Sequence, residues 1–236
     1  MPVRLEPGLE QRVLAHWGAV LAVPPAELDQ DGHIVIADPR DFAAERRATI
    51  RTARGMLLLA APAEESIAQA DPAAYCSAVD AHAQGSGLLH YLAAPPPGDA
   101  DPRVRVLGAA DRPFLDALKE KAGAAATEEA DVEVDHPVAV GIVENGSLLA
   151  IGSLLDEECD TVDVGVLVDP AQRRRGLGAA VVRDLAKRAT STGRLVQYRC
   201  DVDNEASAGL ARTCGFALWG VLAVAPQPEP VVTIDT

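Results

Sequence analysis

The residues best suited to bind a ligand form one run of arginines and glycines. It reads Arg173-Arg174-Arg175-Gly176-Leu177-Gly178-Ala179. The run follows a turn at Asp169-Pro170 and precedes a helix-period pattern that continues to Ala189. Backbone N–H groups at the start of a helix have no partner within the helix and bind anions. Glycines let an anion approach this backbone, and arginines add charge and forked donors, so the run predicts a phosphate-binding turn.

Two common phosphate motifs do not match this run. A P-loop needs Gly-Lys-Ser/Thr after its glycines, and no such triplet follows Gly178. A dinucleotide fingerprint needs a third Gly or Ala where this chain has Val181, and an acidic residue at the end of the next strand. The pattern that remains is Arg/Gln-x-x-Gly-x-Gly/Ala, which extends from Arg173 to Gly178.

The segments around the run extend this pattern. Residues 161–168 and 194–200 show strand patterns, Asn204-Glu205-Ala206-Ser207 opens a short helix, and Cys214-Gly215-Phe216 follows it. In this order and spacing, the motifs resemble those of the GNAT superfamily of acetyl-CoA-dependent N-acyltransferases. The resemblance covers residues 103–225. It implies the GNAT-type α/β fold, a mixed central sheet flanked by helices, to which residues 1–92 add an N-terminal α/β domain.

The resemblance also implies how acetyl-CoA, the cosubstrate, would bind. Its pantetheine arm would pair with the backbone of one strand between two diverging strands, and its pyrophosphate would rest on the amides of the arginine turn. An N–H near Val166 would polarise the thioester. The residues implied in this binding are Val166, Leu167, Val168, Arg173, Arg174, Arg175, Gly176, Leu177, Gly178, Ala179, Asn204 and Ser207.

Asp163 and Tyr198 are the main candidates for catalysis. Asp163 lies near the strand position where many GNAT relatives carry a glutamate base, and a catalytic and a structural role are both open; Glu157 and Glu158 are further candidates. Many relatives carry a tyrosine acid at the position that is Ala211 here. Tyr198 can replace it only if its hydroxyl points into the site.

Several features have a simpler interpretation. A run of arginines is usually a solvated surface, although cations are unfavourable at a helix start unless an anion meets them. Asn204 is also a typical N-cap residue. The function predicted from these motifs is acetyl transfer to a primary amine by direct attack. The alternatives are a CoA-binding sensor or regulatory protein with little or no catalysis, and an interaction module that has lost its ligand.

The composition narrows the function class. The net charge of −14 argues against nucleic acid as the main partner and suits a cationic amine, a small molecule or a protein amino group. The four cysteines and five histidines lack metal-ligand spacing, so no metal site is predicted. No apolar run is long enough to span a membrane, and residues 1–30 lack a signal-peptide pattern. A cytoplasmic location is expected.

The chain divides into four segments by sequence: 1–92, a proline-rich linker at 93–102, the GNAT-like segment 103–225 and a tail at 226–236. For segment 1–92, a degenerate second GNAT-like unit and a small cap or dimerisation module are both open, as is a homodimer. Asp111 is a candidate cap of the first helix after the linker. Residues 121–134 are either a helix or a mobile segment. The expected helices are 13–21, 25–28, 72–83, 111–121, 177–189 and 205–213, and the expected strands are 33–37, 56–60, 103–107, 138–143, 148–155, 161–168, 194–200 and 216–224.

Overall fold

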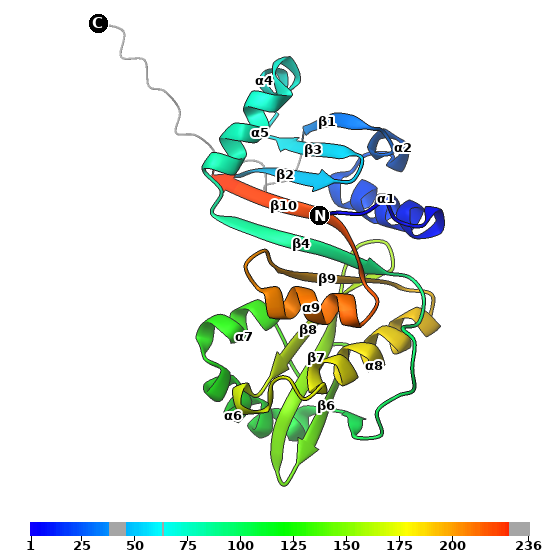
Figure 1. Ribbon diagram of the computed structural model, residues 1–236, viewed down its shortest axis with the longest axis vertical. Helices are drawn as coiled ribbons and strands as arrows, with labels where there is room; N and C mark the ends of the chain where they lie inside the picture. The colour runs from blue at the N-terminus through cyan, green and yellow to red at the C-terminus, as the bar shows by residue number, and fades with distance from the viewer. Residues whose placement is uncertain (38–45, 63, 227–236) are drawn as a thin grey trace, which may run out of the picture.

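The protein is built on one ten-stranded sheet. The computed structural model describes residues 1–37, 46–62 and 64–226, so the predicted tail lies outside the described residues beyond Pro226. The strand order is β1-β3-β2-β10-β4-β9-β8-β7-β6-β5. Elements from the start of the chain occupy one end of an elongated molecule, and elements from the GNAT-like segment occupy the other (Figure 1).

The C-terminal end of the sheet begins with an antiparallel meander. It consists of β5 (Val104–Val106), β6 (Val138–Glu144), β7 (Ser147–Asp156) and β8 (Thr161–Val168). Asn145 and Gly146 have φ values of 50° and 72° and form the tight turn between β6 and β7 that the Asn-Gly pair predicts. The predicted strands of this meander are therefore confirmed, to within one or two residues at each end.

A second group of elements follows the meander. These elements are α8 (Leu177–Ser191), β9 (Leu195–Asp201), α9 (Glu205–Thr213) and β10 (Ala217–Pro226). Two more helices, α6 (Arg112–Ala122) and α7 (Ala124–Ala130), lie between β5 and β6. The helix at α7 confirms the helical alternative for residues 121–134.

The prediction that Asp111 caps α6 is wrong. Its carboxylate makes no capping bond to α6; its oxygens accept from the Arg105 guanidinium at 2.6 and 3.1 Å and from Gly108 N at 3.1 Å. A charged partner on the neighbouring strand competes successfully for this carboxylate, because ionised pairs make the stronger hydrogen bonds.

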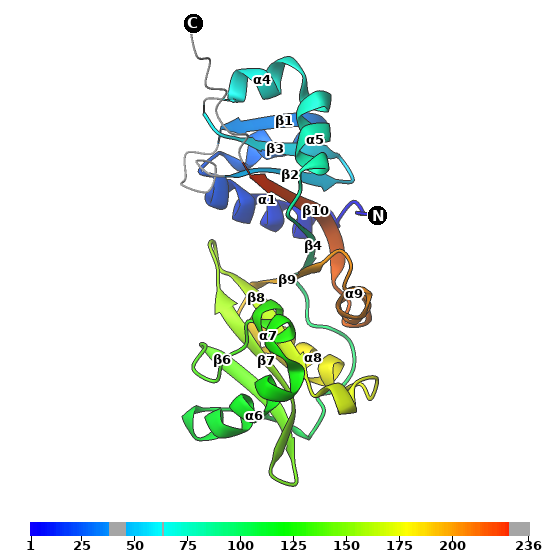
Figure 2. The same ribbon diagram turned by 90° about the vertical axis from the view of Figure 1, so that its left-hand side faces the viewer.

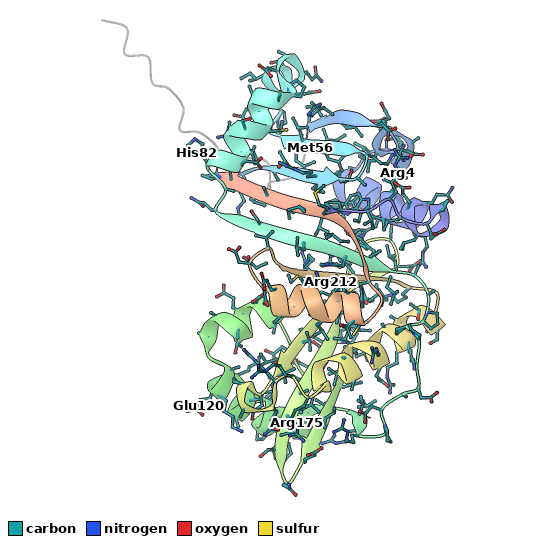
Figure 3. The ribbon with its side chains drawn as sticks, in the orientation of Figure 1. Arg4, Met56, His82, Glu120, Arg175 and Arg212 are labelled. Atoms are coloured by element: carbon teal, nitrogen blue, oxygen red, sulfur yellow. The ribbon has the colours of Figure 1, made fainter. Side chains whose placement is uncertain are left out.

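The N-terminal end of the sheet is smaller. It contains α1 (Pro7–Leu21), α2 (Pro25–Leu28), β1 (Gly32–Ala37), β2 (Arg46–Thr52), β3 (Gly55–Ala60), α4 (Glu65–Ala70), α5 (Pro72–Ala81) and β4 (Gly85–Leu92). Met56 of β3, labelled in Figure 3, packs under α5 with its sulfur 3.0 Å from that of Cys76. The sequence patterns did not predict β2, β4 and α4; β2 contains three arginines and β4 two glycines, and α4 has only six residues.

The sheet does not divide at the linker. Strand β4 comes from segment 1–92, yet it lies between β9 and β10 and pairs antiparallel with both. Strand β10, from the GNAT-like segment, pairs in turn with β2. The boundary at 93–102 therefore separates the chain in sequence but not in the sheet, and Figure 2 shows β4, β9 and β10 side by side between the two ends.

The N-terminal strands do not repeat the β8–α8–β9 unit. Helix α8 joins two parallel neighbours, whereas within the described residues β4, the strand that follows α5, pairs with β9 and β10 and not with β3. Within its described residues, segment 1–92 therefore lacks a β–α–β unit of this kind.

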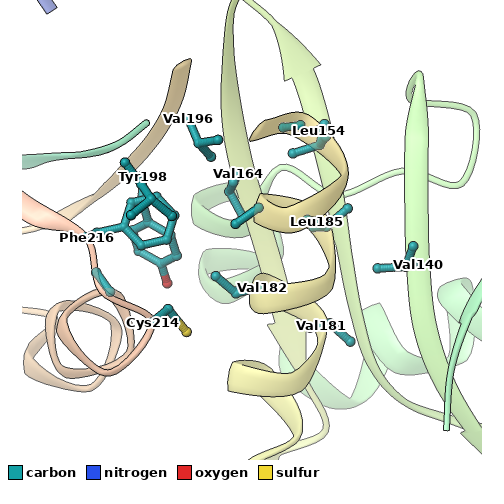
Figure 4. Packing of buried hydrophobic residues seen from close by; sticks show 14 of the residues in the cluster. Val140, Leu154, Val164, Val181, Val182, Leu185, Val196, Tyr198, Cys214 and Phe216 are labelled. Atoms are coloured by element: carbon teal, nitrogen blue, oxygen red, sulfur yellow. The ribbon is translucent and has the colours of Figure 1, made fainter. Parts of the chain in front are cut away.

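Helices cover both faces of the C-terminal half of the sheet. Val182 and Leu185 of α8 pack against Val164 of β8 on one face, beside Tyr198 and Phe216 (Figure 4). On the other face, Leu115 and Leu118 of α6 form a second cluster with β6, β7 and β8. The apolar stripe of α8, which recurs every three or four residues, explains why this helix lies flat on the sheet.

Candidate functional site

The site begins where β8 and β9 separate. The two parallel strands pair at three positions only, the last being Asp163 opposite Gln197. Hydrogen bonds from Asp169 N to Leu149 O and from Glu157 N to Thr161 O set the ladder between β7 and β8. Successive residues of a strand direct their backbone groups to opposite neighbours, and here the odd-numbered residues of β8 bond to β7. The backbone groups of Val164, Val166 and Val168 are therefore directed towards the gap.

A cleft of about 730 Å³ lies in this fork. Its walls come from α7, the second half of β8, the arginine turn with the start of α8, Tyr198 and Arg199 of β9, and α9. The volume falls in the range of small-molecule sites. The predicted residues that line it are Val166, Leu167, Val168, Arg173, Arg174, Gly176, Leu177, Gly178, Ala179, Tyr198, Asn204 and Ser207.

The arginine turn has the backbone that the glycines predict. After the short 3-10 turn Pro170–Gln172, capped by Asp169, Arg174 and Gly176 have φ values of 63° and 78°. Helix α8 then starts at Leu177, and Leu177, Gly178 and Ala179 of its first turn, whose N–H groups have no partner within the helix, line the cleft. Arg173 and Arg174 line the cleft. Arg175 does not line it, because its guanidinium bonds to the side chain of Gln172.

The two glycines of the turn have different reasons for being glycine. An added Cβ at Gly176 would meet no atom within 4 Å, so the positive φ alone requires glycine there. At Gly178, an added Cβ would lie 3.3 Å from both Leu210 and Val168. Gly178 therefore lets α8 approach α9 and β8 closely.

Asn204 and Ser207 join α9 to the cleft. Asn204 Oδ1 accepts from Ser207 N at 3.0 Å, which confirms the N-cap, and Asn204 Nδ2 donates to Glu129 of α7 at 2.7 Å. The Ser207 hydroxyl lies 2.8 Å from the Tyr198 hydroxyl. Burial raises the pKa of Tyr198, so the phenol stays protonated at neutral pH and can donate a proton or a hydrogen bond. Tyr198 is among the residues that line the cleft, and it is only 1% exposed, so the acid role stays a prediction.

Asp163 lies beside the cleft and not on its wall. Its Oδ2 accepts from Arg199 Nε at 2.8 Å, and within the described residues its Oδ1 makes no hydrogen bond of ordinary geometry. Burial raises the pKa of Asp163, and the charge of Arg199 opposes that shift. The space beside it at Gly165 is filled, since an added Cβ there would lie 2.3 Å from Ala130 O of α7. These contacts suit a structural role better than a base.

Among the wall residues that sequence patterns did not predict, two are charged, Glu129 and Arg199. Arg199 holds Asp163 at 2.7 Å while its side chain stays 52% exposed, so it can still reach a ligand. Glu129 is the one carboxylate among the described residues of the wall. No local motif marked Glu129, because only the packing of α7 against β8 brings it opposite Asn204.

The match to a known family covers the whole of this site. Residues 105–216 match the family model described as the acetyltransferase (GNAT) family. These residues therefore form a GNAT-superfamily domain, as the motifs predict. The proteins of that family are acetyltransferases, and the family generally uses an acyl-CoA as cosubstrate.

Solved structures share the fold. A GNAT-family protein from Novosphingobium aromaticivorans is 23% identical, with a TM-score of 0.50 over 61% of this chain and 66% of that one. A GNAT-family acetyltransferase from Colwellia psychrerythraea is 14% identical, with a TM-score of 0.52 over 77% of this chain and 65% of that one. The chain thus spans slightly less than two thirds of each. No curated protein matches the sequence.

The described helices also bear on the membrane prediction. In residues 1–37, 46–62 and 64–226, no helix combines the length and the apolar character that crossing a membrane requires. The cytoplasmic location stays a prediction.

Proposed function

We propose that this protein is an N-acetyltransferase that moves the acetyl group of acetyl-CoA to a primary amine by direct attack. The cleft is the observation that supports this most directly. It extends from Arg173 and Arg174 at one end to the fork between β8 and β9 at the other. A cosubstrate with phosphates at one end, a long neutral arm and a reactive acyl group matches that arrangement.

The residues present fit such a cosubstrate. The N–H groups at the start of α8 and the two arginines would hold the pyrophosphate. Val166 and Val168, whose backbone groups are directed into the gap, would pair with the amides of the pantetheine arm. The N–H of Val166 would also polarise the thioester carbonyl. The backbone groups of Leu167 are directed towards β7, so this residue would make only van der Waals contact with the cosubstrate.

The attacking amine must lose a proton. Glu129 is the one carboxylate on the described wall and Tyr198 stays protonated, so Glu129 is the side chain there that would accept the proton. The amine nitrogen would bond to the carbonyl carbon as the carbon–sulfur bond breaks. Glu129 or water would take the amine proton, and Tyr198 or water would return one to the thiolate.

Calorimetric titration of the full chain with acetyl-CoA and CoA tests the proposal, followed by thiol release in the presence of a panel of amines. Micromolar or tighter binding with amine-dependent release is the expected result. Binding without release would instead favour the CoA-binding sensor. A folded sample that binds neither compound would reject both functions.

A further inference from the structure

Helix α1 is attached to the two strands that form the fork. Arg12 Nη2 donates to Gly193 O at 2.5 Å, and His16 Nδ1 lies 3.1 Å from Glu158 O. Gly193 belongs to the turn before β9, and Glu158 to the turn before β8. Figure 2 shows α1 close to the turn before β8. The N-terminal region therefore holds both strands at their starts, on the paired side of the fork.

A chain of buried hydrogen bonds continues from α1 into the sheet. Trp17 Nε1 donates to the Tyr91 hydroxyl at 2.9 Å, and that hydroxyl donates to Gln197 Oε1. Tyr91 and Gln197 are 0% and 3% exposed. An indole N–H can only donate, so the phenol oxygen accepts from it and its own proton must go to Gln197. This direction turns the Gln197 amide nitrogen away from Tyr91.

Gln197 stands at the fork itself. It is opposite Asp163 in the last pair between β8 and β9, and its side chain is near enough to lower the pKa of Asp163. Asp163 in turn binds Arg199, which lines the cleft. Side chains thus connect α1, through β4, to the wall of the cleft.

We propose that Tyr91 is a positioning residue through which the N-terminal region sets the opening between β8 and β9. Strand β4, which carries Tyr91, pairs with β9 on the side opposite to β8, so it can fix β9 while β8 is held by β7. Without the hydroxyl, Gln197 loses the contact that orients its amide beside Asp163. The side chains then no longer restrain β8 and β9 where they separate, while the backbone hydrogen bonds between the strands remain. The effect of Tyr91 on CoA binding rests on the proposed function, whereas its effect on the fork does not.

The test compares Tyr91→Phe with Tyr75→Phe in the full chain. Tyr75 is also a buried tyrosine, and its hydroxyl bonds to Leu59 O at 3.3 Å, away from the fork. Hydrogen exchange without ligand should become at least about fivefold faster in residues 162–168 and 195–199 for Tyr91→Phe only, the factor expected for one lost hydrogen bond. The affinity for CoA should weaken by about the same factor.

A second variant separates positioning from stability. Trp17→Phe leaves Tyr91 and Gln197 in place but loses the indole donor to Tyr91 and the stacking against Trp219. It should therefore lower the melting temperature more than Tyr91→Phe while affecting exchange at the fork and CoA affinity less. Equal effects of Tyr91→Phe and Tyr75→Phe, or effects that follow the loss of melting temperature, would overturn the inference. If the wild type binds no CoA, the proposed function fails and the exchange data alone decide on Tyr91.

Discussion

The sheet contains two parallel strand pairs, and they differ in how far they stay together. Strands β1 and β3 pair at six positions, along the whole of both strands. Strands β8 and β9 pair at three and then diverge around a cleft of about 730 Å³. Buried backbone groups require partners. The open pair, β8 and β9, therefore leaves backbone donors and acceptors for a ligand. In the closed pair, β1 and β3, these groups bond to each other.

The turns that follow these pairs differ in charge as well. Strand β8 leads to a turn with Arg173 and Arg174 before the N-terminus of α8, while β3 leads to Glu64 and Glu65 at the N-terminus of α4. Carboxylates at the start of a helix interact favourably with the positive end of its dipole. Arginines there do not, so the start of α8 stays available to an external anion. Both the backbone and the charge thus support the proposal that a ligand binds between β8 and β9.

The largest effect that we expect tests the closed pair. In Gly55→Ala, the added Cβ would lie 1.9 Å from Gly32 O of β1, so the two strands must separate. The free energy of unfolding should fall by about 3 kcal/mol, as for a severe overpacking. Gly176→Ala, in the turn between β8 and α8, meets no atom within 4 Å and should cost only about 1 kcal/mol of left-handed strain. Urea denaturation measures both, and equal losses would contradict the distinction.

The second prediction concerns chemistry at the open pair. Glu129→Gln keeps an acceptor for Asn204 but cannot take a proton, so kcat should fall about a hundredfold with CoA affinity unchanged. The exposed neighbour Glu128 is the control, and Glu128→Gln should leave the rate as in the wild type. Thiol release at saturating acetyl-CoA measures both. An unchanged rate in Glu129→Gln would remove Glu129 from the proton transfer.

The third prediction separates the arginines of the turn. Arg174→Gln should weaken CoA binding by roughly tenfold, because it removes a charged donor worth about 1.5 kcal/mol at the phosphate end. Arg175→Gln should have little effect, since Arg175 bonds to Gln172 and does not line the cleft. Calorimetry at two salt concentrations measures both affinities for CoA. An equal loss of affinity in Arg175→Gln and Arg174→Gln would contradict the prediction.

The smallest effect concerns β4, the strand beside the open pair. Burial lowers the pKa of His90, and the charge of Arg212 on α9, labelled in Figure 3, acts in the same direction. The unfolded chain then binds the proton more readily, so this contribution to stability is present above about pH 6.5 and is lost as pH falls below it. The slope is at most about 1.4 kcal/mol per pH unit for one histidine.

His90→Leu should flatten the pH dependence of the unfolding free energy between pH 7 and 5, because it removes the buried imidazole. His82→Leu makes the same change at an exposed position and should leave the curve as it is. Denaturant unfolding at several pH values measures this. The buried His16, whose pKa is also lowered by burial, should keep part of the slope in both variants.

Sequence patterns predicted the local parts of the site well. Strand alternation located β8, and four-residue spacing located α8, because each pattern reflects burial of one face of one element. The Asn204 cap was also predictable, since a cap involves a side chain and a backbone only three residues apart. Strands β2 and β4 were missed, because partners distant in sequence stabilise them.

The sequence by itself determined the GNAT-type domain, the arginine turn and the order of its elements, because neighbouring residues encode these features. Only the tertiary structure decided that β4 lies between β9 and β10, that Asp163 binds Arg199 beside the cleft, and that Glu129 faces Asn204. Such contacts join residues tens of positions apart. They depend on which strands pair and which faces pack, and no local spacing records that choice.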